Sequence, residues 1–159
     1  GEQAGDLGID TRRLATMGDS AGGNLSIVVA QQAALQGLSV PKLVVAVYPK
    51  TDGASDMPSI TQLGGGQGGL DGDMIHWFHN HYIQDDTLVG DYRISPLRNP
   101  DIAGHPDTIV VTATDPLRDE GLEYGEKLRA ASTWSTWTTR SWCTASSPWA
   151  APSPAPAKR

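Results

Sequence analysis

A serine in a glycine-rich turn constrains the fold of this 159-residue chain more than any other feature. The segment Gly18-Asp19-Ser20-Ala21-Gly22 fits the pattern G-x-S-x-G, in which a tight turn carries a serine from a strand into a helix. We expect a side chain two residues before or after the serine to press against backbone, because strand and helix come close there. The preceding residues predict a buried strand, and residues 24–35 predict a largely buried helix.

Such a turn makes Ser20 a candidate nucleophile. The N-terminus of the following helix carries free N–H groups and partial positive charge, so the N–H of Ala21 is a candidate donor to an oxyanion. The plainer alternative is a serine that only caps the helix. The strand-turn-helix context favours the nucleophile. The similar serine motif of chymotrypsin-like proteases does not apply, because Ala21 interrupts it and a helix follows.

Two later apolar runs predict further strands of an α/β fold. Residues 42–48 are a β-branched run typical of a buried parallel strand, and residues 108–113 are another, which ends just before Asp115. Functional groups gather at the C-terminal ends of such strands, so Asp115 is a candidate acid. It could equally cap a helix over residues 117–128, and the two roles are compatible. Asp119 and Glu120 are interpreted as carboxylates favoured by the dipole at the start of that helix.

Four segments together resemble landmarks of one family. They are Gly18-Asp19-Ser20-Ala21-Gly22-Gly23-Asn24-Leu25, Tyr48-Pro49-Lys50-Thr51-Asp52, Ser95-Pro96-Leu97 and Asp115-Pro116-Leu117-Arg118-Asp119-Glu120-Gly121. In this order they resemble the bacterial hormone-sensitive-lipase-like esterases of the α/β-hydrolase superfamily. The resemblance implies a mostly parallel sheet with flanking helices, of which residues 1–131 form an incomplete, C-terminal part that begins at Gly1 without an initiator methionine.

The same resemblance implies an activity and a site. It implies hydrolysis of small carboxylic esters through an acyl-enzyme on Ser20, with Asp115 as the triad acid, Ala21 in the oxyanion hole, and no metal or organic cofactor. A second oxyanion donor would come from a segment before Gly1. The alternatives are an amidase or peptidase on the same fold, and a non-catalytic fragment that acts as an interaction partner.

The triad histidine that the family places after the acid is missing. All four histidines, His76, His79, His81 and His105, precede Asp115. Residues 132–159 are rich in Trp, Ser, Thr and Pro and contain no Val, Ile or Leu. A shifted reading frame over residues 132–149, written in GC-rich codons, gives a strand pattern followed by His-Gly-Phe. We therefore expect a one- or two-base insertion or deletion near Ala131, a disordered tail that does not fold like the rest, and an inactive chain.

Composition and spacing disfavour several other classes of function. The formal net charge of −6 and the lack of a basic stripe argue against a nucleic-acid partner. No apolar run approaches the roughly 20 residues of a membrane span, so a soluble, cytoplasmic protein is favoured. Residues 51–69 are predicted to form a loop, whose glycines at 64–69 lack the lysine of a phosphate loop. Asp71 is a candidate N-cap of a helix that runs through Tyr82. On that helix the histidine pair His76 and His79 has no third ligand at helical spacing. The single Cys143 excludes an internal disulfide, and the sequence leaves the oligomeric state open.

Overall fold

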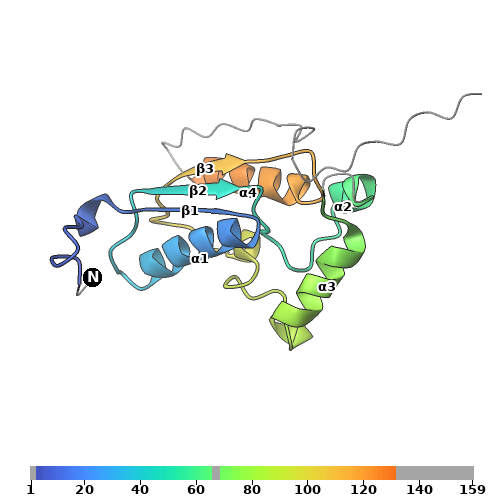
Figure 1. Ribbon diagram of the computed structural model, residues 1–159, viewed down its shortest axis with the longest axis horizontal. Coiled ribbons are helices and arrows are strands. Elements are labelled where there is room, and N and C mark those ends of the chain that lie inside the picture. Colours follow the sequence, from blue (N-terminus) through green and yellow to red (C-terminus); the bar gives the residue numbers. More distant parts are fainter. Residues whose placement is uncertain (1–2, 66–68, 132–159) are drawn as a thin grey trace, which may run out of the picture.

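The computed structural model describes residues 3–65 and 69–131. Strands β1 (Ala15–Asp19), β2 (Leu43–Val47) and β3 (Asp107–Val111) form one parallel sheet in that order. The helices are α1 (Ala21–Leu35), α2 (Pro58–Leu63), α3 (Gly72–Tyr82) and α4 (Arg118–Ala131) (Figure 1). Short 3-10 turns span Thr11–Arg13, Asp86–Leu88 and Pro96–Arg98. The predicted α/β class and strand positions are confirmed.

Helices α1 and α4 pack against the same face of the sheet. Val44 and Ala46 of β2 and Val110 of β3 point to this face, where they form one cluster with Ile27 of α1 and Tyr124 of α4. The alternate residues of β2 are only half-buried. Because strand side chains alternate between faces, the described core lies on one side of the sheet.

The expectation that the strand before Ser20 is buried was wrong. Strand β1 pairs only with β2 among the described strands, and its side chains are exposed or half-buried, Met17 being 73% exposed. Only β2 pairs with β1 among the described residues, and the burial of a strand depends on the elements packed beside it, which an apolar run does not specify. Apolar pattern therefore predicted the existence of β1 but not its environment.

Helix α1 was also expected to bury its large apolar residues, and it does so only in part. Leu25 and Val29 are exposed, whereas the polar side chains of Asn24 and Gln31 are buried. The buried polar groups are hydrogen-bonded: Asn24 Nδ2 donates to the carbonyl oxygens of Lys50 and Ile94, at 2.6 and 2.8 Å. The inner face of α1 thus contributes hydrogen bonds to neighbouring loops as well as apolar contact.

The segment between β2 and β3 approaches the C-terminal ends of the strands. The residues expected to form a loop from 51 to 69 include the short helix α2, which is a correction. Helix α3 begins as predicted, with Asp71 Oδ1 accepting a hydrogen bond from the N–H of Met74 at 2.7 Å, and it ends at Tyr82 as expected.

No described helix is long and apolar enough to cross a membrane. The tail of residues 132–159, with Cys143 and the inferred frame change, lies outside the described residues.

Candidate active site

Ser20 lies in a sharply bent backbone between β1 and α1. Its φ is 51° and its ψ is −117°, and only Tyr48 among the other described non-glycine residues also has a positive φ. Such a conformation costs about 1–3 kcal/mol and persists only where the surroundings impose it. Here the N–H of Ser20 donates to the carbonyl oxygen of Val47 at 2.9 Å, and the Ser20 carbonyl accepts from Asn24 N at 3.1 Å. The Ser20 side chain makes no capping hydrogen bond, so the alternative of a simple helix cap loses its support.

The close approach of strand and helix requires glycine at position 18 of the motif, but at position 23 rather than at the expected position 22. A Cβ on Gly18 would lie 2.3 Å from the carbonyl carbon of Gly22, which confirms the predicted close approach of strand and helix. A Cβ on Gly22 would meet no described atom within 4 Å, so the expectation for that residue was wrong. The crowded helical position is Gly23, whose Cβ would lie 3.0 Å from Cβ of Pro49. The loop after β2 therefore packs against the first turn of α1 one residue further along than the motif suggested.

A pocket of about 330 Å³ opens beside Ser20. Ser20 and Ala21 border it at the start of α1, and Leu117 borders it near the start of α4. Helix α3, below the sheet in Figure 1, contributes the opposite wall, and most of the lining is apolar: Leu25, Leu70, Ile75, Phe78, Ile83, Ile94 and Leu117. A half-buried serine at the edge of such a pocket is accessible to a small apolar substrate.

Asp115 follows β3 and caps the turn that leads into α4. Its Oδ1 accepts a hydrogen bond from the N–H of Leu117 at 2.8 Å, so the predicted capping role is confirmed. Burial raises the pKa of Asp115, although the Leu117 N–H and the nearby Arg118 oppose this shift. A carboxylate held at the cost of partial desolvation at the C-terminal end of a strand is typical of a functional site.

Asparagine at position 115 is expected to stabilise the chain at neutral pH. Because burial raises the pKa of Asp115 in the folded state, its ionisation is unfavourable there. The resulting destabilisation is absent below the unfolded pKa of about 4 and complete above the folded pKa. Asp115→Asn keeps an oxygen that can accept from Leu117 N–H, so the melting temperature should rise by about 2–4 °C at pH 7.

The measurement is thermal unfolding by circular dichroism at pH 7 and pH 3. At pH 3 the two proteins should melt within about 1 °C of each other, because Asp115 is then protonated in both states. A gain in melting temperature of equal size at both pH values would show that ionisation of Asp115 is not its cause.

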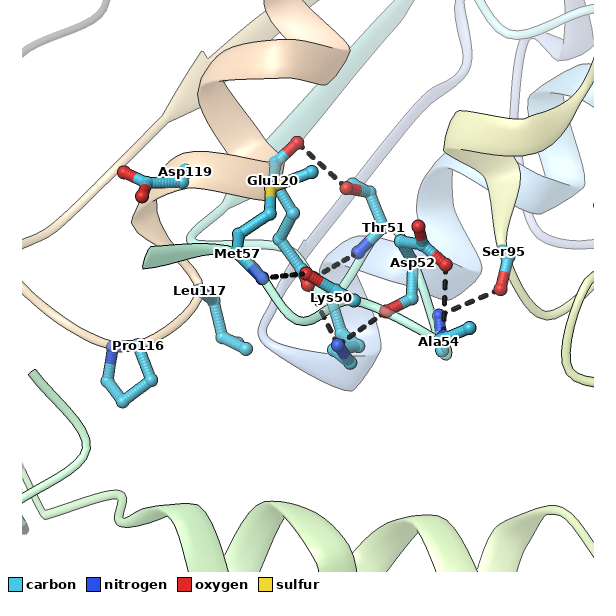
Figure 2. Close-up of polar contacts among 12 residues, drawn as sticks. Lys50, Thr51, Asp52, Ala54, Met57, Ser95, Pro116, Leu117, Asp119 and Glu120 are labelled. Carbon is cyan, nitrogen blue, oxygen red and sulfur yellow. Dashed lines mark hydrogen bonds and ion pairs between the residues drawn. The ribbon is translucent and has the colours of Figure 1, made fainter. Parts of the chain in front are cut away.

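Glu120 makes contacts that its position at the start of a helix did not indicate. It lies in the first turn of α4 but is fully buried, and its Oε2 accepts from Lys50 Nζ at 2.8 Å. Its Oε1 accepts from Thr51 N at 2.6 Å, and Thr51 Oγ1 donates to the Glu120 carbonyl oxygen at 2.9 Å (Figure 2). Burial raises the pKa of Glu120, while the Lys50 ammonium and the Thr51 N–H oppose that rise. Its contacts go beyond the favourable helix dipole that the sequence suggested.

The family-like segments that begin at Tyr48, Ser95 and Asp115 meet beside the first turn of α4. Thr51 O accepts from Leu97 N at 3.0 Å, which joins the segment after β2 to the Ser95-Pro96-Leu97 segment. Asp52 forms a two-pronged ion pair with Arg98, with 2.8 Å from Nε to Oδ1 and 3.0 Å from Nη2 to Oδ2. A spacing of more than 40 residues hides these contacts in the sequence, although the three motifs were each visible.

The histidines occupy different environments. His79 is half-buried and borders the pocket beside Ser20, with its Nε2 3.9 Å from Asp86 Oδ1, whereas His76 and His81 are exposed. Nε2 of His105 lies 3.1 Å from the hydroxyl oxygen of the buried Tyr124, and burial lowers the pKa of His105. Within the described part of the chain, no three His, Cys, Asp or Glu residues are grouped to hold a metal ion.

The bent serine, the helix that begins directly after it and the acid after β3 define the class of protein as an α/β hydrolase. Comparison with known proteins agrees: a family described as having the α/β-hydrolase fold matches residues 1–140. The chain therefore belongs to the α/β-hydrolase family, in the hormone-sensitive-lipase-like branch that the motifs indicated.

Individual relatives point the same way. The chain is 39% identical over 132 residues to an ethyl acetate hydrolase of Pseudomonas putida, covering 82% of this chain and 41% of the relative. It is 43% identical over 127 residues to the carboxylic ester hydrolase LipN of Mycobacterium tuberculosis, covering 76% of this chain and 34% of that protein. The solved structure of a hyperthermophilic esterase from Pyrobaculum calidifontis matches with a TM-score of 0.80 and 32% identity, over 86% of this chain and 44% of that one.

The chain aligns with less than half the length of each of these proteins. The chain spans about two fifths of the length of these relatives, for example 41% of the ethyl acetate hydrolase. A second esterase structure, from Pseudomonas putida, gives a TM-score of 0.80 and 35% identity over 87% of this chain and 43% of that protein. The family match over residues 1–140 includes Ser20, the three strands of the sheet and Asp115.

Proposed function

We propose that the protein to which this chain belongs hydrolyses carboxylic esters through a covalent intermediate on Ser20. The observation that carries the proposal is the conformation of Ser20 at the edge of a pocket. Its backbone has φ 51°, and its side chain makes no hydrogen bond that caps α1. A strained serine whose hydroxyl does not stabilise the helix is expected to serve another purpose. The names of the relatives, which are ester hydrolases, support an ester as the substrate.

The proposed reaction assigns one role to each candidate residue. The Ser20 hydroxyl attacks the acyl carbonyl, and the alcohol leaves as the acyl-enzyme forms. The N–H of Ala21, the first residue of α1, would stabilise the oxyanion together with the partial positive charge of the helix end. Asp115 would orient a histidine base, which must come from outside this sequence or from a corrected C-terminus. Water then releases the acid, and the reaction requires no metal or organic cofactor.

The apolar walls of the pocket support a small apolar acyl or alcohol group. Ile75 and Phe78 from α3 line the pocket that Ser20 borders, together with Leu25 from α1 and Leu117. Burial of an apolar substrate group contributes about 25 cal/mol per Å² of buried surface, so such a pocket favours esters of short-chain acids over charged substrates.

The test uses the chain extended by the DNA that flanks it, sequenced upstream of Gly1 and across Ala131. A fluorophosphonate should label the extended protein on Ser20, identified by mass spectrometry, and no label should form in Ser20→Ala. The unlabelled extended protein should cleave p-nitrophenyl butyrate faster than butyryl-p-nitroanilide. Faster cleavage of the anilide would indicate an amidase. A folded extended protein without label would contradict a nucleophilic role for Ser20, and an in-frame sequence identical to residues 132–159 would contradict the inferred frame change.

A further inference from the structure

Ser20 and Asp115 follow strands that are not neighbours. Ser20 comes directly after β1 and Asp115 comes after β3, while β2 lies between the two strands and pairs with both. No ladder hydrogen bond joins β1 to β3 in the described sheet. Besides β2 itself and the contact of α1 with α4 through Gln31 and Tyr124, the segment that follows β2, where Lys50 and Thr51 lie, connects the surroundings of the two candidate site residues.

This segment is bonded to the serine turn on one side. The N–H of Lys50 donates to the Ser20 carbonyl oxygen at 3.3 Å, and the Lys50 carbonyl accepts from Asn24 Nδ2 at 2.6 Å. Both bonds reach the first turn of α1, beside the bent residue. A shift of Lys50 would therefore be transmitted to the turn that holds Ser20.

On its other side the segment is bonded to one residue of α4. Figure 2 shows the Glu120 side chain directed from α4 toward Lys50 and Thr51. The carboxylate accepts from Lys50 Nζ and from Thr51 N, at 2.8 and 2.6 Å, and Thr51 Oγ1 returns a bond of 2.9 Å to the Glu120 carbonyl. Glu120 lies in the same first turn of α4 that Asp115 precedes.

We propose that Glu120 is a positioning residue that links the loop of Asp115 to the turn of Ser20 through Lys50 and Thr51. The proposal rests on the proposed function, since it assigns Glu120 to the geometry of that site. Glu120 itself is not among the residues that border the pocket beside Ser20. A buried carboxylate is costly to desolvate, and the hydrogen bonds that it accepts from Lys50 Nζ and Thr51 N offset part of this cost while they join α4 to the segment after β2.

Asp119 provides a matched control on the same turn. Its Oδ2 accepts from Ser59 N at 2.9 Å, so it joins α4 to α2 rather than to the serine turn. Asp119→Asn and Glu120→Gln each replace one carboxylate by an amide at neighbouring positions of α4. Only Glu120→Gln is expected to affect Ser20, because only Glu120 contacts Lys50 and Thr51.

The test replaces Ser20 by a thiol, so it requires no ester hydrolysis. In a Ser20→Cys, Cys143→Ser background, the introduced thiolate displaces iodide from iodoacetamide, and the rate is measured against pH. A helix N-terminus stabilises a thiolate, so the pH at which the rate reaches half its maximum (the midpoint) should lie below that of a free thiol. If Glu120→Gln loosens the turn, the midpoint should rise by about 0.5 to 1 pH unit as that stabilisation is lost.

The direction in which the midpoint shifts distinguishes a positioning role of Glu120 from a direct effect of its charge on the thiolate. Removing the Glu120 charge while Lys50 stays positive would by itself lower the midpoint, because a nearby cation favours a thiolate. A rise in Glu120→Gln with no change in Asp119→Asn supports the proposal. An unchanged or lower midpoint in Glu120→Gln overturns it, and so does an equal rise in Asp119→Asn.

Folding of each variant is checked by its cooperative melting in circular dichroism. If Glu120→Gln does not fold, Thr51→Val takes its place, because it removes only the bond from Thr51 Oγ1 to the Glu120 carbonyl. That variant should show a smaller rise of the midpoint in the same direction, and the absence of any rise would then overturn the proposal. Lack of esterase activity in the extended protein would leave these rates unaffected, so the two proposals can fail separately.

Discussion

The 159-residue chain is expected to release p-nitrophenol from p-nitrophenyl acetate no faster than its own Ser20→Ala variant. The reason is that all four histidines precede Asp115 in the sequence, so the base that follows the acid in this family is missing. In serine hydrolases, loss of the base alone costs about 10⁶-fold in kcat. Removal of one oxyanion donor costs a further factor of about 10² to 10³, and Ala21 N–H is the candidate donor that the resemblance assigns within this chain.

The measurement is a stopped-flow trace at an enzyme concentration high enough to reveal one turnover. A burst of p-nitrophenol in the chain that disappears in Ser20→Ala would contradict the prediction. His79 is the control for that outcome, because it is the one described histidine that borders the pocket beside Ser20. If a burst occurs and His79→Ala removes it, His79 supplies a base that the order of the family motifs does not reveal.

Alanine at position 18 is expected to destabilise the chain by about 3 kcal/mol or more. A Cβ there would lie 2.3 Å from both the carbonyl carbon and the carbonyl oxygen of Gly22. These atoms belong to the backbone of α1, so relief requires the strand and the helix to separate, which also disrupts the bent turn at Ser20. Urea unfolding followed by circular dichroism measures the change in the free energy of unfolding.

Gly22→Ala is the matched control within the same motif. Its Cβ would meet no described atom within 4 Å, and alanine favours a helix over glycine by about 0.5 to 1 kcal/mol. The variant should therefore be as stable as the original chain or more so. Equal destabilisation by Gly18→Ala and Gly22→Ala would mean that the close approach of β1 and α1 does not decide the requirement for glycine.

The sequence predicted those features that depend on neighbouring residues. The order of strand, turn and helix around Ser20 could be predicted because glycine spacing and apolar runs are local signals. The cap of α3 by Asp71 and that of the turn after Asp115 are local for the same reason. Local pattern was also sufficient to place β2 and β3 within a residue or two of their observed bounds.

Features that depend on distant contacts were missed. Glu120 resembles any acidic residue at a helix start, and only the fold places it against Lys50, 70 positions earlier. Met17 and Leu25 were expected inside because they are apolar, yet which face of β1 or α1 is covered depends on the elements packed there. The crowding at Gly23 depends in the same way on Pro49 in another loop.

The bend at Ser20 has a consequence for how such an enzyme could arise and be rebuilt. The groups that contact the bend directly, which are the Val47 carbonyl, the Lys50 and Asn24 amides and the packing at Gly18, all lie within one stretch of fewer than 40 residues, and Glu120 acts on them only through Lys50 and Thr51. One short segment therefore contains all the groups that contact the Ser20 turn directly. Such a segment can be inherited or transplanted before the other catalytic residues are supplied. A laboratory lineage could therefore begin from this stretch and acquire a proton acceptor afterwards.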